Sequence, residues 1–309
     1  MQTISSHHLK LSQLTLGTVQ LGVSYGIANK VGKPDESQSR SLLEKADQLG
    51  IRCFDTAAGY GDSEKVLGRY FQAAPPQDRL IVTKFKLKPD VDYSDADLER
   101  EVRSQLEESL QRLGIKQVPI YLLHQAGDLH RWQDRLVRVL DRLARENLIG
   151  LAGVSIYRGE DLDLMLQYDL FQATQIPINI FDQRLIRSGH LQRLQEAGII
   201  VFSRSVFLQG LFFMDPAQLP PKLAGAAPLL EGLHRLAAAE NLPVAQLALS
   251  FVRDLPGITS LVIGSETPEQ VAENVRLIEG PALSPAGMAT AGGLFPEVPE
   301  LIVNPFLWQ

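Results

Sequence analysis

The chain has 309 residues, 45% hydrophobic and 21% charged, which is close to the globular average and enough for a full core. Its formal net charge of −6 argues against nucleic acid or an anionic membrane as a partner. Cys53 is the only cysteine, which excludes an internal disulfide and fits a reducing compartment. Because neither a membrane-spanning apolar run nor a signal peptide is recognisable, we expect a soluble cytoplasmic protein.

Residues 3–16 alternate weakly and predict a small hairpin, and the glycine-rich stretch 17–26 lacks the spacing of a dinucleotide fingerprint. From residue 36 onward, strand and helix patterns alternate regularly along the chain. Strands are predicted at 14–18, 51–55, 80–84, 118–123, 149–155, 171–176, 199–203 and 259–263. Helices are predicted at 36–49, 63–71, 95–113, 131–147, 160–168, 185–197, 226–240, 244–254 and 268–278.

This alternation calls for a parallel sheet, and eight strand–helix units over this length favour an α/β fold closed into a (β/α)8 TIM barrel. An open doubly wound sheet is the alternative, but no glycine fingerprint follows the first strand. We expect one domain over 1–309, with the hairpin at its N-terminus. Residues 280–309 are rich in proline and glycine and predict an irregular C-terminal tail packed over the barrel.

Three consecutive predicted strands carry an apolar stripe that ends in an ionisable residue. Side chains alternate along a strand, so each stripe lies on one face. In a barrel, the carboxyl ends of the strands converge on the face that holds active sites. Each of these ionisable residues alone could have a structural role, as a helix or turn cap, as a side chain that reaches for solvent, or as a hydrogen-bonded core group. Such roles would not place all of them at the same position, at the end of a strand. The stripes end in Asp55, Lys84 and His124, and Tyr60 follows Asp55 in the loop before a helix.

These four residues suit one chemical task. An unperturbed tyrosine has a pKa of about 10, and a nearby lysine ammonium is expected to lower the pKa of Tyr60. Asp55 would hold Lys84 charged and in place, while His124 would orient an incoming oxygen. Together they predict a general acid that protonates a carbonyl oxygen as charge develops on it. Because no side chain donates hydride, a nicotinamide cofactor is implied.

The stretches FDTAAGYGDSEKVLG, IVTKF, YLLH, GVSIY and TPEQVAEN, with the strand end at Gln175, resemble the aldo-keto reductases over essentially the whole chain. The resemblance implies NAD(P)H-dependent reduction of an aldehyde or ketone to an alcohol. It assigns Tyr60 as proton donor, Lys84 and Asp55 as groups that tune it, and His124 as the group that orients the substrate. It also implies an extended cofactor across the barrel mouth, with no Rossmann domain and no metal.

The resemblance assigns further residues to the cofactor. Ser155 and Gln175 match residues that hold the carboxamide, although the Asn usual after that Ser is Ile156 here. Phe202 falls where an aromatic ring stacks on the nicotinamide, Ser203 would lie near the pyrophosphate, and Arg204 would pair with a phosphate or with a surface carboxylate. The other expected cofactor contacts are Gly17, Thr18, Asp55, Gly264, Ser265, Gln270 and Asn274.

The cofactor's 2′-phosphate is where the sequence departs most from the family. Many members carry a Lys and an Arg in the matching segment, whereas this chain has Gly264 and Gln270, and Glu266 adds negative charge. A 2′-phosphate needs charge-assisted donors, and a nearby carboxylate opposes it. Family habit favours NADP(H), and the local charge favours NAD(H) or dual use unless Arg184 and Arg187 compensate.

The expected partner is a small-molecule carbonyl substrate, bound by a monomer. Two other functions stay open: a nicotinamide-binding regulatory or sensor barrel with little turnover, and a Schiff-base aldolase that uses Lys84. The aldolase needs a neutral lysine, which Asp55 disfavours. The tail from 299 to 309 is expected to fold back toward the mouth. The expected substrate pocket comprises Val19, Tyr25, Phe85, Tyr157, Phe306 and Trp308.

Overall fold

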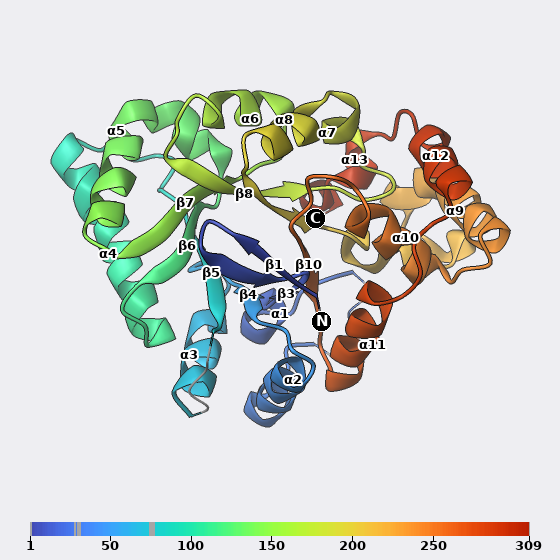
Figure 1. Ribbon diagram of the computed structural model, residues 1–309, viewed down its shortest axis with the longest axis horizontal. Coiled ribbons are helices and arrows are strands. Elements are labelled where there is room, and N and C mark those ends of the chain that lie inside the picture. The colour runs from blue at the N-terminus through green and yellow to red at the C-terminus, as the bar shows by residue number, and fades with distance from the viewer. Residues whose placement is uncertain (1, 28, 30–31, 74–77, 309) are drawn as a thin grey trace.

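The computed structural model describes residues 2–27, 29, 32–73 and 78–308, and it contains a closed barrel of parallel strands surrounded by helices (Figure 1). Around the barrel the strands follow the order β10-β3-β4-β5-β6-β7-β8-β9. The predicted (β/α)8 architecture is therefore confirmed. The barrel strands are β3 (Leu14–Gly17), β4 (Cys53–Asp55), β5 (Leu80–Phe85), β6 (Val118–Leu123), β7 (Ile149–Ser155), β8 (Phe171–Pro177), β9 (Ile200–Arg204) and β10 (Ser260–Gly264).

The helices bury an apolar stripe against the outside of the barrel, and their ends carry the expected caps. The α4 helix starts at the Ser94 cap and stops at Gly114, whose φ of 68° suits glycine. The helices on the barrel are α1 (Val19–Gly22), α2 (Glu36–Gln48), α3 (Ser63–Ala73), α4 (Asp95–Leu113), α5 (Ala126–Arg145), α6 (Gly159–Met165), α7 (Arg184–Arg187), α8 (His190–Glu196), α9 (Ala227–Ala239), α10 (Val244–Arg253) and α11 (Pro268–Ile278).

The N-terminal hairpin closes one end of the barrel. Its strands β1 (Thr3–Ser6) and β2 (Leu9–Ser12) pair antiparallel, as predicted, and lie across the barrel in Figure 1. Leu11 joins the apolar cluster inside the barrel with Cys53 and Leu80, which begin β4 and β5. Because the hairpin covers the end where strands begin, the opposite end remains available for a site.

Several segments are more regular or more divided than predicted. The C-terminal tail contains α12 (Pro285–Leu294), α13 (Glu300–Val303) and the 3-10 turn η4 (Pro305–Trp308), because Pro285 starts a helix behind a Ser284 cap. The helix predicted at 185–197 is split into α7 and α8 at Gly189, whose φ is 75°. After β9 the chain forms the 3-10 segments η1 (Leu208–Phe213), η2 (Pro216–Gln218) and η3 (Pro221–Ala226).

Within the described chain, no helix combines the length and the hydropathy that crossing a bilayer requires.

Candidate active site

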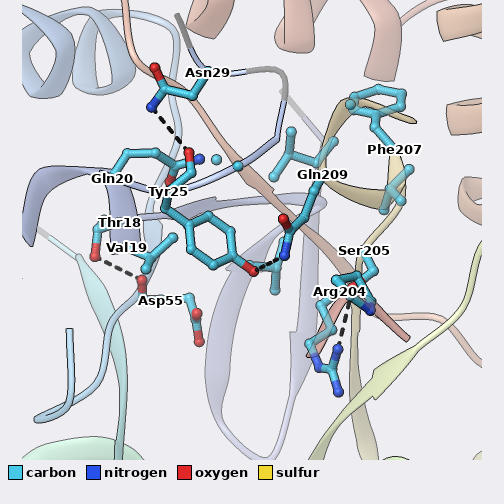
Figure 2. A pocket seen from close by; sticks show the side chains of 18 of the residues that line it. Thr18, Val19, Gln20, Tyr25, Asn29, Asp55, Arg204, Ser205, Phe207 and Gln209 are labelled. Atoms are coloured by element: carbon cyan, nitrogen blue, oxygen red, sulfur yellow. Dashed lines mark hydrogen bonds between the residues drawn. The ribbon is translucent and has the colours of Figure 1, made fainter. Parts of the chain in front are cut away.

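A cavity of about 610 Å³ opens at the carboxyl ends of the barrel strands (Figure 2). Asp55, Tyr60 and His124 line it, and the fully buried Lys84 lies against Asp55. Two other lining residues are joined to each other, because Gln209 Nε2 donates a hydrogen bond of 2.9 Å to the hydroxyl of Tyr25. A cavity of this size is typical of sites for small molecules and cofactors. The structure thus brings all four residues of the predicted tetrad to one place.

Lys84 and Asp55 form a buried ion pair. Lys84 Nζ donates to Asp55 Oδ1 at 2.6 Å and to the Thr56 carbonyl oxygen at 2.9 Å. The two side chains are 0% and 4% exposed. Burial lowers the pKa of Lys84, and Asp55 acts in the opposite direction. Gln175 Nε2 donates to the same carboxylate oxygen at 2.8 Å. Because Lys84 is paired, the geometry does not favour a free amine nucleophile.

Tyr60 lies between this ion pair and His124. Lys84 Nζ is 5.0 Å from the centre of the Tyr60 ring. The Tyr60 and His124 rings meet edge to face, with centroids 5.4 Å apart and an angle of 79°. Burial and then the Asp55 carboxylate raise the pKa of Tyr60 well above its usual value, so the expected lowering by Lys84 is not found. Tyr60 is therefore held in its acid form.

His124 is held neutral. Burial, and then the positive charges of Lys84, Lys86 and Arg204, lower the pKa of the imidazole to about 3. A neutral imidazole carries one N–H donor and one acceptor nitrogen. His124 can therefore donate a hydrogen bond to a substrate oxygen without adding a charge to the cavity.

The position of Tyr60 depends on a close approach between two loops. The Ser63 hydroxyl donates to the Thr18 carbonyl oxygen at 2.8 Å, and the Thr18 hydroxyl donates to the Asp55 carbonyl oxygen at 2.8 Å. At Gly22, a Cβ would lie only 1.6 Å from the Tyr60 carbonyl oxygen. The sequence offered only a weak signal for this contact, because the glycine-rich stretch 17–26 matches no known spacing.

Replacing Gly22 by Ala should therefore move Tyr60. We expect a loss of about 1–3 kcal/mol in the free energy of unfolding from overpacking, and a fall of about 100-fold in kcat from misplacement of the acid. Gly127→Ala is the control, because a Cβ at Gly127 meets nothing within 4 Å. Urea unfolding and steady-state kinetics would measure both effects. Equal behaviour of the two variants would show that the Gly22 contact does not position Tyr60.

The carboxyl ends of β7 and β8 offer polar groups that fit a nicotinamide carboxamide. Ser155 and Gln175 are direct neighbours in the barrel register and both line the cavity. The side-chain nitrogen of Gln175 is engaged by Asp55, so its oxygen is left to accept a hydrogen bond. Gln20 also lines the cavity, and its buried Oε1 has no hydrogen-bond partner in the described chain. The residues present therefore fit a cofactor that carries amide and hydroxyl donors.

The register of β9 corrects the prediction for Phe202. Phe202 is 0% exposed and packs inside the barrel, so it offers no ring face to the cavity. Ser203 points to the other side of the strand and donates to the Ile178 carbonyl oxygen at 3.2 Å. Arg204 does reach the cavity, together with Ser205, which sequence reasoning missed. The residue of β9 that reaches the cavity is therefore Arg204, two positions after Phe202, and this strand offers no aromatic ring to the cavity.

Two of the predicted pocket residues lie elsewhere, whereas Val19, Tyr25, Tyr157 and Phe306 line the cavity. Phe85 is 1% exposed and stacks on Tyr121, with centroids 4.7 Å apart, in the layer between strands and helices. Its side chain follows the inward-facing Lys84 and so points outward. Trp308 does not line the cavity, and its indole N–H donates to the Leu301 carbonyl oxygen at 2.7 Å.

The end of the cavity beside β10 and α11 is acidic. Gly264, Gln270 and Asn274, which were predicted to contact the cofactor, line this end, and Glu266 and Glu273 add two carboxylates. Ser265 lies behind this surface and accepts a hydrogen bond of 3.1 Å from Asn274, and Thr18 and Gly17 line the neighbouring β3 edge.

Neither Arg184 nor Arg187 lines the cavity. Arg184 pairs with Asp182 at 2.8 Å, and Arg187 donates to the Pro296 and Phe295 carbonyl oxygens, each at 2.7 Å. Compensation of the missing 2′-phosphate contacts by these two arginines is therefore not found.

The protein is thus a parallel (β/α)8 barrel in which a buried lysine–aspartate pair lies beside a tyrosine, at the end of the barrel where this fold carries its active sites. Residues 13–291 match the model of the Aldo/keto reductase family. The chain therefore belongs to the aldo/keto reductase family, as the resemblance implied, and is an oxidoreductase of a family that uses nicotinamide cofactors and small carbonyl substrates.

Relatives and solved structures agree with this assignment. The chain is 27% identical to L-glyceraldehyde 3-phosphate reductase of Escherichia coli K12, over 91% of this chain and 88% of that protein. It is 26% identical to the NADH-specific methylglyoxal reductase of the same organism, over 86% and 90% of the two chains. An aldo-keto reductase structure from Bacillus halodurans matches the fold with a TM-score of 0.76 at 22% identity, over 95% of both chains.

Proposed function

We propose that this protein reduces an aldehyde or a ketone to the alcohol, with Tyr60 as the proton donor. The observation that supports this most strongly is the buried Lys84–Asp55 pair facing the Tyr60 ring at the cavity wall. Burying an ion pair is costly, and a pair placed beside a titratable phenol in a cavity has a functional reason to be there.

In the proposed reaction, each tetrad residue has a separate part. Ser155 and Gln175 would hold the carboxamide of a reduced nicotinamide, which would supply the hydride when bound. His124 donates a hydrogen bond that orients the carbonyl oxygen, and Tyr60 transfers its proton to that oxygen as negative charge develops. Lys84 then offsets the charge of the tyrosinate, and Asp55 holds Lys84 in place.

We further propose that NADH serves at least as well as NADPH. Glu266 and Glu273 line the end of the cavity where family resemblance places the adenosine. Gln270 Oε1 accepts a hydrogen bond of 2.7 Å from the backbone N–H of Glu266. The doubly negative 2′-phosphate would therefore meet carboxylates and no basic side chain from this segment. The name of the NADH-specific methylglyoxal reductase among the relatives agrees with this proposal.

The test is carbonyl-dependent oxidation of NADH and of NADPH, with dissociation constants measured by fluorescence titration. We expect turnover of small aldehydes with NADH and an NADH affinity equal to or above that of NADPH. Glu266→Lys should tighten NADPH binding by about 10-fold, because one carboxylate becomes a charge-assisted donor.

An NADPH affinity far above that of NADH in the wild type would refute the cofactor proposal. Tight binding of either cofactor without turnover of any carbonyl would instead favour the regulatory or sensor function.

A further inference from the structure

Arg204 is a cation inside the cavity that the proposed reaction does not use. It is the last residue of β9, partly buried, and its side chain lines the cavity with Tyr60 and His124. Figure 2 shows it beside Ser205, on the side of the pocket away from Thr18 and Asp55. The inward register of β9 places Ile200 and Phe202 inside the barrel, so Arg204 is the residue of this strand that meets a ligand.

Among the described residues, the contacts of the guanidinium group are with neutral partners. Its carbon lies 4.0 Å from the centre of the Tyr157 ring. Nη1 donates to the Ser205 hydroxyl at 3.3 Å, and Nη2 donates to the Ile156 carbonyl oxygen at 3.5 Å. Across the described part of the chain, no carboxylate lies within 4.0 Å of the Arg204 guanidinium, the distance at which the two groups would form an ion pair. A guanidinium carries five N–H donors, so several remain available for an anion.

The position of Arg204 indicates which ligand brings that anion. Its guanidinium lies over the ring of Tyr157, two residues beyond Ser155, and its positive charge contributes to lowering the pKa of His124, so Arg204 belongs to the catalytic end of the cavity. The expected adenosine end is formed instead by β10 and α11, with Glu266 and Gln270. An oxyanion held by Arg204 therefore lies next to the carbonyl that Tyr60 protonates.

We propose that Arg204 binds an acidic group of the substrate, a carboxylate or a phosphate, so that the substrate class is a carbonyl compound with an anionic substituent. This inference rests on the proposed carbonyl reduction. The planar guanidinium fork matches two oxygens of one anion, and the Tyr157 ring fixes the plane of that fork. The pyrophosphate of the cofactor is the other possible source of an anion, and the experiment separates the two.

The test compares two aldehydes of the same shape, para-carboxybenzaldehyde and para-formylbenzamide, which differ in charge. We expect Arg204→Gln to lower kcat/KM for the carboxylate by about 10- to 100-fold, mainly through KM. The amide should change by less than about 3-fold, and the dissociation constant of NADH should not change. Arg204→Lys should be intermediate, since it keeps the charge but loses the fork. Arg193→Gln, which removes an exposed arginine paired with Asp163, is the matched control.

A second measurement does not depend on turnover. Benzoate and benzamide are titrated into the wild type and Arg204→Gln by calorimetry, and benzoate binding alone should weaken in the variant. If the wild type reduces no aldehyde but binds benzoate through Arg204, the anion site stands and the proposed reduction fails. Equal losses for the charged and neutral aldehydes, or no benzoate binding, would overturn the inference. A weaker NADH affinity with unchanged aldehyde KM would also overturn it and assign Arg204 to the pyrophosphate.

Discussion

Replacing Tyr60 by Phe is expected to lower kcat for carbonyl reduction by about 10²- to 10⁴-fold, the range that a positioned general acid contributes. The ring, its packing against His124 and its contact with Lys84 all persist in the variant, because only the hydroxyl is removed. The dissociation constant of the cofactor should therefore stay within a few-fold of the wild type. Single-turnover kinetics and fluorescence titration would measure the two quantities separately.

The pH dependence provides an independent check of the same assignment. Because burial and Asp55 raise the pKa of Tyr60, the acid form should persist through neutral and mildly alkaline pH, and wild-type reduction should not decline there. The reverse oxidation needs the deprotonated tyrosine and should rise with pH over the same range. Retention of more than a tenth of wild-type kcat by Tyr60→Phe would rule out Tyr60 as the proton donor.

Replacing Asp55 by Ala should produce the largest loss of stability, about 3–5 kcal/mol in the free energy of unfolding, as well as loss of activity. Lys84 Nζ donates to Asp55 and to the Thr56 carbonyl oxygen in the wild type. The substitution leaves Lys84 fully buried and removes the first of these two contacts. Lys84 would then have a pKa further below that of an unfolded lysine. Because the unfolded state would bind more protons, stability should recover as pH rises from 7 toward 10. Urea unfolding at several pH values would measure this.

The double variant Asp55→Ala/Lys84→Met is the control for that experiment. Removing both charges leaves no uncompensated ion, so the double variant should be more stable than Asp55→Ala alone at neutral pH. It should also lack the recovery of stability at high pH. Two results would contradict this energetic coupling of Asp55 and Lys84. One is a loss of less than about 1 kcal/mol in the free energy of unfolding of Asp55→Ala, and the other is a double variant less stable than Asp55→Ala.

Most of the barrel could be predicted from sequence because its physics is local and periodic. The stripes ending in Asp55, Lys84 and His124 follow from side-chain alternation, and convergence of strand ends then brings them together. The tail was expected to be irregular because proline and glycine were read as breakers. Pro285 instead occupies the first turn of α12, where its missing N–H costs nothing.

The errors at the site come from register and from long-range packing. Phe202 was assigned to the nicotinamide from the family resemblance, whereas the strand continues for one more inward position, to Arg204. The assignment of Phe85 to the pocket ignored that neighbours on a strand face opposite ways. The Gly22–Tyr60 approach joins the end of α1 to the loop after β4, and α2 lies between them in the sequence, so no local pattern reveals it.

Isotope labelling can test the proposed hydride transfer from a nicotinamide to a carbonyl together with its protonation by Tyr60. The most direct measurement uses NADH deuterated on the transferred position, para-carboxybenzaldehyde as substrate and mass spectrometry of the product. We expect the wild type to form a benzylic alcohol with one deuterium on the former carbonyl carbon, and Tyr60→Phe to lose this product. An alcohol without deuterium, or the same rate of labelled product from Tyr60→Phe, would contradict it.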